Sequence, residues 1–154
     1  MLICPSERTN APATDGNAKN SADEAHRSYI INGWNDYFFD TLSLTDFDQY
    51  MAGAYPNGLK TSAIVLTSDT IVLGEKASDR MDYFMDLLEG SGNDFSGVAE
   101  ESRHDGRGPG TETGGSNYVF ADGSVRFLKC HASLYPLNLW AITDKNRKFY
   151  VVVP

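Results

Sequence analysis

The chain has 154 residues, 41% of them hydrophobic and 22% charged, with a formal net charge of −8 and a pI near 4.7. This length predicts one domain, long enough to bury roughly 70% of the surface of its unfolded chain. The acidic balance and the lack of any Lys/Arg cluster argue against nucleic acid or an anionic membrane surface as a partner. No apolar run approaches the ~20 residues that span a bilayer.

The first part of the chain is polar and then becomes rich in aromatic residues. Residues 1–28 contain Pro, Gly, Asn and Ser and few apolar residues, so we expect an extended loop. Tyr29–Ile31 is a plausible strand that turns at Asn32-Gly33. Trp34, Tyr37 and Phe38 follow, and such rings serve either as core or as an exposed stacking platform for sugars. Core is the expectation for large aromatic residues.

The middle of the chain predicts two helices and one strand. A short helix over 43–51 should be capped by Ser43 or Thr45. Residues 63–66 are expected to be extended, and 71–73 to form a strand. A second helix should begin at Ser78-Asp79 and end before Gly90, because apolar residues recur there at the spacing of one helix face. These residues are Met81, Phe84, Met85 and Leu88.

A β-hairpin is expected over residues 117–128, closed by a two-residue type I′ turn at Asp122-Gly123. Counting outward from that turn places four apolar side chains on one face of the hairpin. They are Tyr118, Phe120, Val125 and Phe127, opposite a mixed face of Asn117, Val119, Ala121, Ser124 and Arg126. Farther on, residues 145–147 predict a turn and 149–153 a final strand.

Four fragments carry a family resemblance. They are Cys4-Pro5-Ser6, the run Thr70–Glu75, the pair Arg103-His104, and residues 114–129, and they occur in the family's order. The chain resembles the prepilin-type proteins that have a C-terminal His and Asp-Gly signature, which are type IV pilin-like and type II secretion pseudopilin-like proteins of bacteria. The family-motif residues are Cys4, Pro5, Ser6, Glu75, Arg103, His104, Asn117, Phe120, Asp122 and Gly123. The glycine-rich insertion 105–115 lengthens the spacing between His104 and Asp122 beyond the family's usual one.

The resemblance implies an α+β fold, namely a pilin-like globular head with a small antiparallel sheet packed on helices and long loops. It implies a structural subunit or minor component of a type II secretion pseudopilus or a type IV pilus-like filament, with other pilin subunits as partners. The location would be the periplasm or cell surface. The family's N-terminal hydrophobic helix, absent from these 154 residues, would anchor the full-length form in the inner membrane. A stand-alone protein without an anchor is the open alternative.

Two other functions compete with the filament subunit. An extracellular carbohydrate-binding module would use Trp34, Tyr37 and Trp140 for stacking. A hydrolase would need Glu75, His104 and Asp122 in one cleft, as ligands or as a proton-transfer set. The sequence has none of the common catalytic motifs, so we expect no enzyme and local structural roles for these three residues.

Bound ions and cofactors are not expected either. Calcium is the one ion kept open, because Asp and Glu oxygens with loop carbonyls suit it. The cysteines Cys4 and Cys130 lie near opposite ends of the chain. In an exported protein a disulfide between them would close a long loop and stabilise the fold; two unpaired thiols in the core are the equally open alternative.

Overall fold

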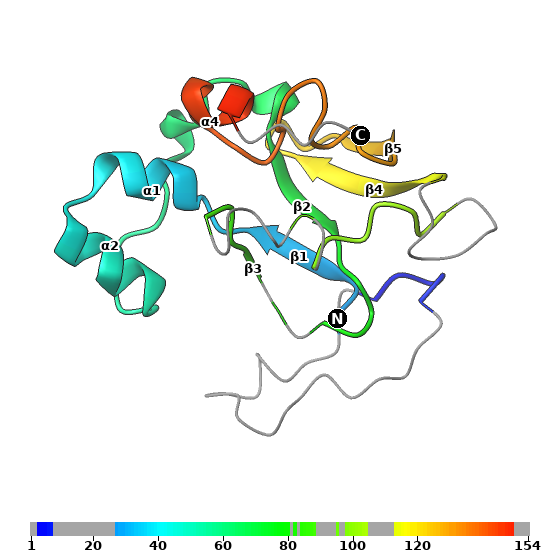
Figure 1. The fold of residues 1–154 in the computed structure, drawn as a ribbon, viewed down its shortest axis with the longest axis horizontal. Coiled ribbons are helices and arrows are strands. Elements are labelled where there is room, and N and C mark those ends of the chain that lie inside the picture. The colour runs from blue at the N-terminus through cyan, green and yellow to red at the C-terminus, as the bar shows by residue number, and fades with distance from the viewer. Residues whose placement is uncertain are drawn as a thin grey trace.

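The computed structural model describes residues 3–7, 27–80, 82, 84–88, 95, 98–104 and 113–149. Within them the fold is α+β (Figure 1). The strands are β1 (Tyr29–Asn32), β2 (Ile71–Glu75), β3 (Phe84–Met85), β4 (Gly115–Phe120) and β5 (Val125–Lys129). The helices are α1 (Asn35–Thr41), α2 (Leu44–Met51) and α4 (Asp144–Phe149), with 3₁₀ turns at Thr61–Ala63 and Thr67–Asp69. None of the helices described is long and apolar enough to span a membrane.

The five strands form one mixed sheet in the order β3-β1-β2-β4-β5. Neighbouring strands from β1 to β5 are antiparallel, while β3 pairs with β1 in parallel. The expected antiparallel sheet is therefore correct except at this edge. In the view of Figure 1, α1 and α2 lie together to the left of the sheet, and α4 lies at its top.

Several predicted elements are confirmed. β1, β2 and the hairpin of β4 and β5 occur where the sequence places them. The helix predicted over 43–51 is α2, and the Ser43 side chain accepts a hydrogen bond from the Asp46 amide at 3.2 Å. This is the N-cap geometry that a serine before a helix predicts.

The helix predicted from Ser78 is wrong across residues 84–88, where the chain forms β3 and then a bend. Phe84 and Met85 pair with Ile31 and Asn32 of β1. Met85, Asp86 and Leu87 are all buried, so this short extended segment runs inside the fold. Strand pairing thus overrides the helical spacing of the apolar residues. The predicted helix residue Met81 lies outside the described residues.

The turn predicted over 145–147 is also wrong, because these residues belong to α4. Arg147 is buried on this helix and donates hydrogen bonds to the carbonyls of Ala141, at 3.1 Å, and Asp69, at 3.0 Å. These contacts fasten the helix to two loops, which a local turn signal does not reveal. Phe149, predicted to begin the final strand, is instead the last residue of α4, and residues 150–153 of that strand lie outside the described part of the chain.

The hairpin has a register one residue away from the predicted one. Val119 faces Val125, and Tyr118 faces Arg126. The turn is a three-residue loop, in which the Phe120 amide donates to the Ser124 carbonyl at 2.9 Å and Gly123 has φ 84°. A three-residue loop with glycine in the left-handed region is a common alternative to the type I′ turn.

This one-residue shift exchanges the two faces of β5. Tyr118 and Phe120 enter the core as predicted, but Val125 and Phe127 do not join them and remain 66% and 51% exposed. Arg126 takes their place, with its guanidinium carbon 4.1 Å from the centre of the Phe120 ring. The predicted four-residue apolar face is therefore wrong for its β5 half.

The core lies against one face of the sheet. The largest fully buried apolar side chains are Trp140, Tyr118, Phe120, Ile30, Ile71, Met85 and Leu87. Trp140 packs edge-on to Tyr118, with ring centroids 6.1 Å apart, and covers Gly74 of β2. Because Trp140 has no exposed surface, it cannot stack on a sugar, and the three-ring platform of the carbohydrate-binding hypothesis is not present.

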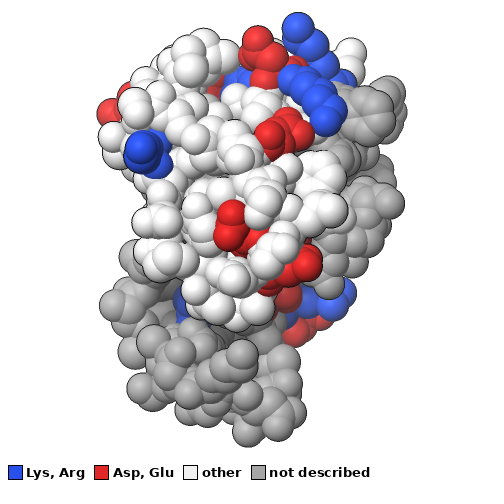
Figure 2. Space-filling view, turned by 90° about the vertical axis from the view of Figure 1, so that its left-hand side faces the viewer, with Lys and Arg blue, Asp and Glu red and all other residues white. Residues whose placement is uncertain are grey.

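α1 and α2 are held together by aromatic contacts. Phe38 is buried, and its ring centroid lies 4.4 Å from that of Tyr50 and 6.1 Å from that of Tyr55. The expectation that this aromatic block serves as core is correct for Phe38. On the side of the molecule seen in Figure 2, the described surface is mostly uncharged, with acidic and basic residues in small separate groups.

Candidate functional site

Glu75, the last residue of β2, is the centre of the candidate site. Its side chain has no exposed surface. One carboxylate oxygen, Oε2, accepts a hydrogen bond from the Asn117 amide at 3.0 Å, and the other, Oε1, lies 2.8 Å from His104 Nε2. The Arg103 Nε atom is 3.9 Å from the same Oε1. A buried carboxylate needs such partners, because burial without them is costly.

The Arg103-His104 pair is held beside the start of β4 by backbone hydrogen bonds. The His104 amide donates to the Gly115 carbonyl at 2.9 Å, and the Arg103 amide donates to Ser116 Oγ at 3.3 Å. The two side chains then reach Glu75 on the neighbouring strand. His104 is 25% exposed along its side chain, whereas the Arg103 side chain is fully buried.

Cys4 reaches the site through a tight turn. The Glu7 amide donates to the Cys4 carbonyl at 2.9 Å across Pro5-Ser6, a place in a turn that proline favours. The Cys4 amide donates to Ser28 Oγ at 2.9 Å, and its Sγ lies 3.8 Å from His104 Nε2. Glu7 at the end of the turn pairs with Arg103 NH1 at 3.1 Å.

Tyr29 of β1 completes the surroundings of Cys4. Its hydroxyl hydrogen-bonds the Cys4 side chain. Burial above all, together with the neighbouring charges of Cys4 and Glu75, raises the pKa of Tyr29 to about 12. The tyrosine therefore stays protonated near neutral pH and can donate its hydrogen bond to a thiolate.

The thiol and the carboxylate approach the same nitrogen of His104. In a Cys-His-acid relay the nucleophile and the acid contact different ring nitrogens. Here Nε2 contacts both Glu75 Oε1 and Cys4 Sγ. One ligand atom from each of the three side chains lies within 4.8 Å of the other two. This convergence suits shared binding of one cation better than proton relay.

The structure brings together two of the three residues in the predicted Glu75, His104 and Asp122 set. Asp122 lies in the hairpin turn that follows β4. Its Oδ1 accepts a hydrogen bond from the Ser124 amide at 2.9 Å, and its Oδ2 accepts one from Arg126 at 3.3 Å. The local role predicted for Asp122 is confirmed, and the three-residue cleft required by the hydrolase hypothesis is not formed. Cys4 was missed as a member of the set, although it stands in a recognised motif.

The two cysteines lie in different side-chain groups and are both thiols. Cys4 belongs to the group just described. Cys130 lies with Glu101 and His131, within 4.8 Å of both. The pairing of Cys4 with Cys130 considered from the sequence is therefore not present, because each thiol has its own histidine and carboxylate neighbours.

Residues from all four sequence fragments named above, which are far apart in the chain, lie together around Glu75. Arg103, His104 and the Asn117 amide all contact Glu75, and Cys4 contacts His104. No protein-family model, curated protein or solved structure matches this chain.

An apolar sheet face adjoins the site. Outside the core, the neighbouring side chains Ile31, Leu73, Val119 and Val125 line up across β1, β2, β4 and β5, since each is paired with the next. Ile31 is 48% exposed and Leu73 and Val119 are partly exposed. We call this row, together with Phe127, the open face.

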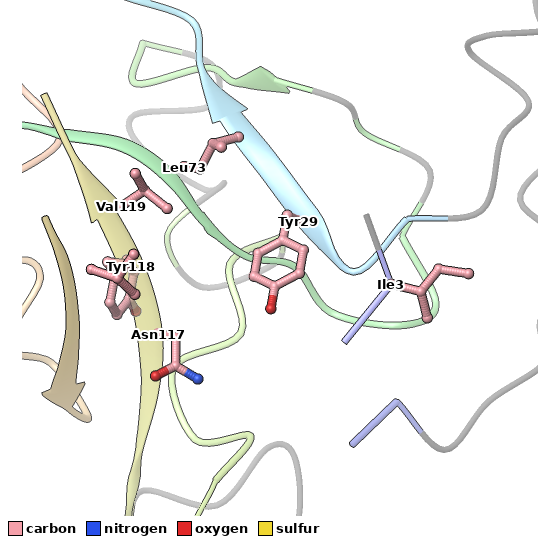
Figure 3. Close-up of a pocket in the computed structure, with 7 residues that line it drawn as sticks. Ile3, Tyr29, Leu73, Asn117, Tyr118 and Val119 are labelled. Atoms are coloured by element: carbon pink, nitrogen blue, oxygen red, sulfur yellow. The ribbon is translucent and has the colours of Figure 1, made fainter. Parts of the chain in front are cut away.

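A hollow of about 340 Å³ lies on the open face (Figure 3). Its lining residues are Ile3, Tyr29, Leu73, Asn117, Tyr118, Val119 and Val125. Tyr29 borders both the hollow and the Cys4 side chain, while Ile3 approaches from the N-terminal segment (Figure 3). The site thus stands at one end of an apolar surface.

Proposed function

We propose that this chain is the globular head of a type IV pilin-like or type II secretion pseudopilin-like filament subunit. The head would decorate the filament and contact neighbouring subunits, as the resemblance of its four sequence motifs implies. In this proposal the protein is a structural component at the periplasmic side of the inner membrane or on the cell surface.

The observation that carries the proposal is the open face. A continuous apolar row crosses four strands and leaves Val125 and Phe127 more than half exposed. Contiguous exposed apolar surface on a soluble domain is typical of an interaction site. We propose that its occupant is the apolar helix through which such subunits anchor and polymerise.

The position of Ile3 supports this choice of occupant. Ile3 lines the hollow on the open face and is 41% exposed. The next residue, Cys4, is fixed by its hydrogen bond to Ser28. A helix joined to the chain just before Ile3 would therefore be delivered to the open face, and its apolar side chains would complete the burial of Leu73, Val119 and Val125.

The convergence of the recognised motifs gives further support. Cys4, Glu75 and the Arg103-His104 pair form one hydrogen-bonded group that fastens the N-terminal turn to β2 and β4. In a filament subunit this group would hold the junction between the helix and the head, where pulling force enters the domain.

The native coding sequence upstream of residue 1 tests the proposal. We expect a short basic leader that ends in glycine, followed by Phe-Thr-Leu-Ile-Glu and about twenty apolar residues. An ordinary secretory signal peptide there, or a native start at Met1, would contradict the proposal, because neither supplies a helix for the open face.

A further inference from the structure

We propose that Cys4, Glu75 and His104 form a binding site for a single Zn²⁺ ion. This inference does not depend on the filament proposal. It follows from the three side chains themselves, which come from the N-terminal turn, the end of β2 and the segment before β4.

The ligand atoms have the chemistry that zinc prefers. Thiolate, imidazole and carboxylate are its usual ligands in proteins, with bonds of about 2.0–2.3 Å. In a tetrahedral site such bonds place nitrogen and oxygen ligands about 3.3 Å apart and sulfur about 3.5 Å from either. The sulfur is 3.8 Å and the carboxylate oxygen 2.8 Å from His104 Nε2, so each of these two distances is within about 0.5 Å of its tetrahedral value. The sulfur and the oxygen lie within 4.8 Å of each other. Calcium prefers oxygen ligands alone and fits this set poorly.

The charges near the site also favour a divalent cation. Glu75, Glu7 and a Cys4 thiolate would carry three negative charges, and Arg103 supplies one positive charge. A Zn²⁺ ion would bring these four side chains to neutrality. Lys76 also feels the charge of Glu7, but its ammonium donates hydrogen bonds to the carbonyls of Ala77 and Arg80.

Binding would exchange protons for the ion in a defined way. The Cys4 thiol loses its proton to solvent, and the His104 proton moves from Nε2 to Nδ1, so that sulfur and Nε2 each offer a lone pair. Glu75 Oε1 exchanges the imidazole hydrogen bond for the ion, while Oε2 keeps the Asn117 amide. The Tyr29 hydroxyl would remain as a hydrogen-bond donor to the bound sulfur, a contact of the kind that orients metal ligands.

The half-exposed group of Glu101, Cys130 and His131 is a weaker candidate. Glu101 is already held by the segment after β5, where it accepts from the His131 amide at 3.1 Å and from Ser133 Oγ. Cys130 is nevertheless a second thiol, and it would contribute to the absorption band of a cobalt-thiolate bond. The test therefore uses Cys130→Ser, in which Cys4 is the single remaining thiol of the two in the sequence.

The probes are Co²⁺ and Zn²⁺ ions added to chelator-treated, reduced protein. We expect the Cys130→Ser variant to bind one Co²⁺ with the absorption band of a cobalt-thiolate bond, and Zn²⁺ to displace it. Adding His104→Gln should weaken binding by on the order of tenfold or more. Adding His131→Gln instead is the matched control and should leave the affinity and the band unchanged.

A second measurement stays informative if a substitution weakens the fold. In Cys130→Ser, saturating Zn²⁺ should slow alkylation of Cys4 at least about tenfold, and His104→Gln should remove this protection. The proposal is overturned if Co²⁺ gives no thiolate band in Cys130→Ser, or if His131→Gln abolishes binding while His104→Gln does not. It is also overturned if Zn²⁺ leaves the alkylation rate unchanged.

Discussion

His104 Nε2 lies 2.8 Å from Glu75 Oε1, although the two residues are 29 positions apart in the chain. This contact joins the end of β2 to the segment that precedes β4 and also brings Arg103 to the same carboxylate. Glu75 therefore links β2 to β4 through Asn117, and to the N-terminal turn through His104 and Cys4.

Substitution Glu75→Gln should lower the free energy of unfolding by about 3 kcal/mol, because it removes one member of a buried ion pair and leaves Arg103 incompletely compensated. The glutamine can still accept the Asn117 amide, so the backbone fold should persist. Chemical denaturation measures the change. Asp48→Asn on the exposed side of α2 is the control and should have little effect; equal loss in both variants would contradict the role given to Glu75.

Gly74→Ala tests the close packing of the sheet on the core. A Cβ at this position would come within 2.6 Å of Trp140 and 2.9 Å of Tyr118. Both rings are buried, so we expect a loss of about 2 kcal/mol from overpacking. Gly58→Ala is the matched control, since a Cβ there meets nothing within 4 Å. Thermal and urea unfolding of both variants would reveal a difference, and a neutral Gly74→Ala would show that Trp140 packs elsewhere.

Asp36 should make stability depend on pH in an unusual direction. Burial raises its pKa above 3.8, although hydrogen bonds from the Thr143 and Ile142 amides partly oppose this. The folded protein therefore binds the Asp36 proton more tightly than the unfolded chain, and this residue's contribution to stability rises as pH falls through its raised pKa towards 3.8.

Asp36→Asn isolates that contribution. The amide oxygen can still accept the loop hydrogen bonds, but the position no longer titrates. The difference in unfolding free energy between the wild-type protein and the variant, measured from pH 7 to pH 4, should shift in favour of the wild type on acidification. A constant difference, or a shift in favour of the variant, would show that the pKa of Asp36 is not raised in the folded state.

Val125→Gln should separate folding from assembly. Val125 is 66% exposed, so its replacement should change the free energy of unfolding by only about 0.5 kcal/mol or less. If the open face binds an apolar helix, the same change should reduce the recovery of full-length protein in sheared filaments. Leu44→Gln is the control, since Leu44 is 79% exposed on α2 and away from that face. Equal recovery of the two variants would count against the open face as the assembly surface.

Local patterns in the sequence predicted much of this fold. Ser43 as an N-cap, β2 as an apolar strand and the hairpin around Asp122-Gly123 all depend on neighbours in the chain. The failures occurred where distant contacts decide. β3 is extended because it pairs with β1, and α4 is fixed by the hydrogen bonds of Arg147.

The candidate site was only partly predictable for the same reason. The sequence predicts Glu75 and His104 as members of one site, together with Asp122. In the structure the third member is Cys4. The error follows from the hairpin, since Asn117 rather than Asp122 is the β4 residue beside Glu75. The position of Cys4 depends on its hydrogen bond to Ser28, 24 residues away, which no periodic pattern indicates.

The most direct test of the filament account is photo-crosslinking from Phe127 in cells that carry the full-length native protein. A photoreactive amino acid there projects from the open face, whereas one at Leu44 on α2 serves as the control. The account predicts a crosslink from position 127 to an apolar N-terminal helix of the same or a neighbouring subunit, identified by mass spectrometry, and none to that helix from position 44. Crosslinks from position 127 only to unrelated proteins, or no crosslink to an apolar helix, would contradict it.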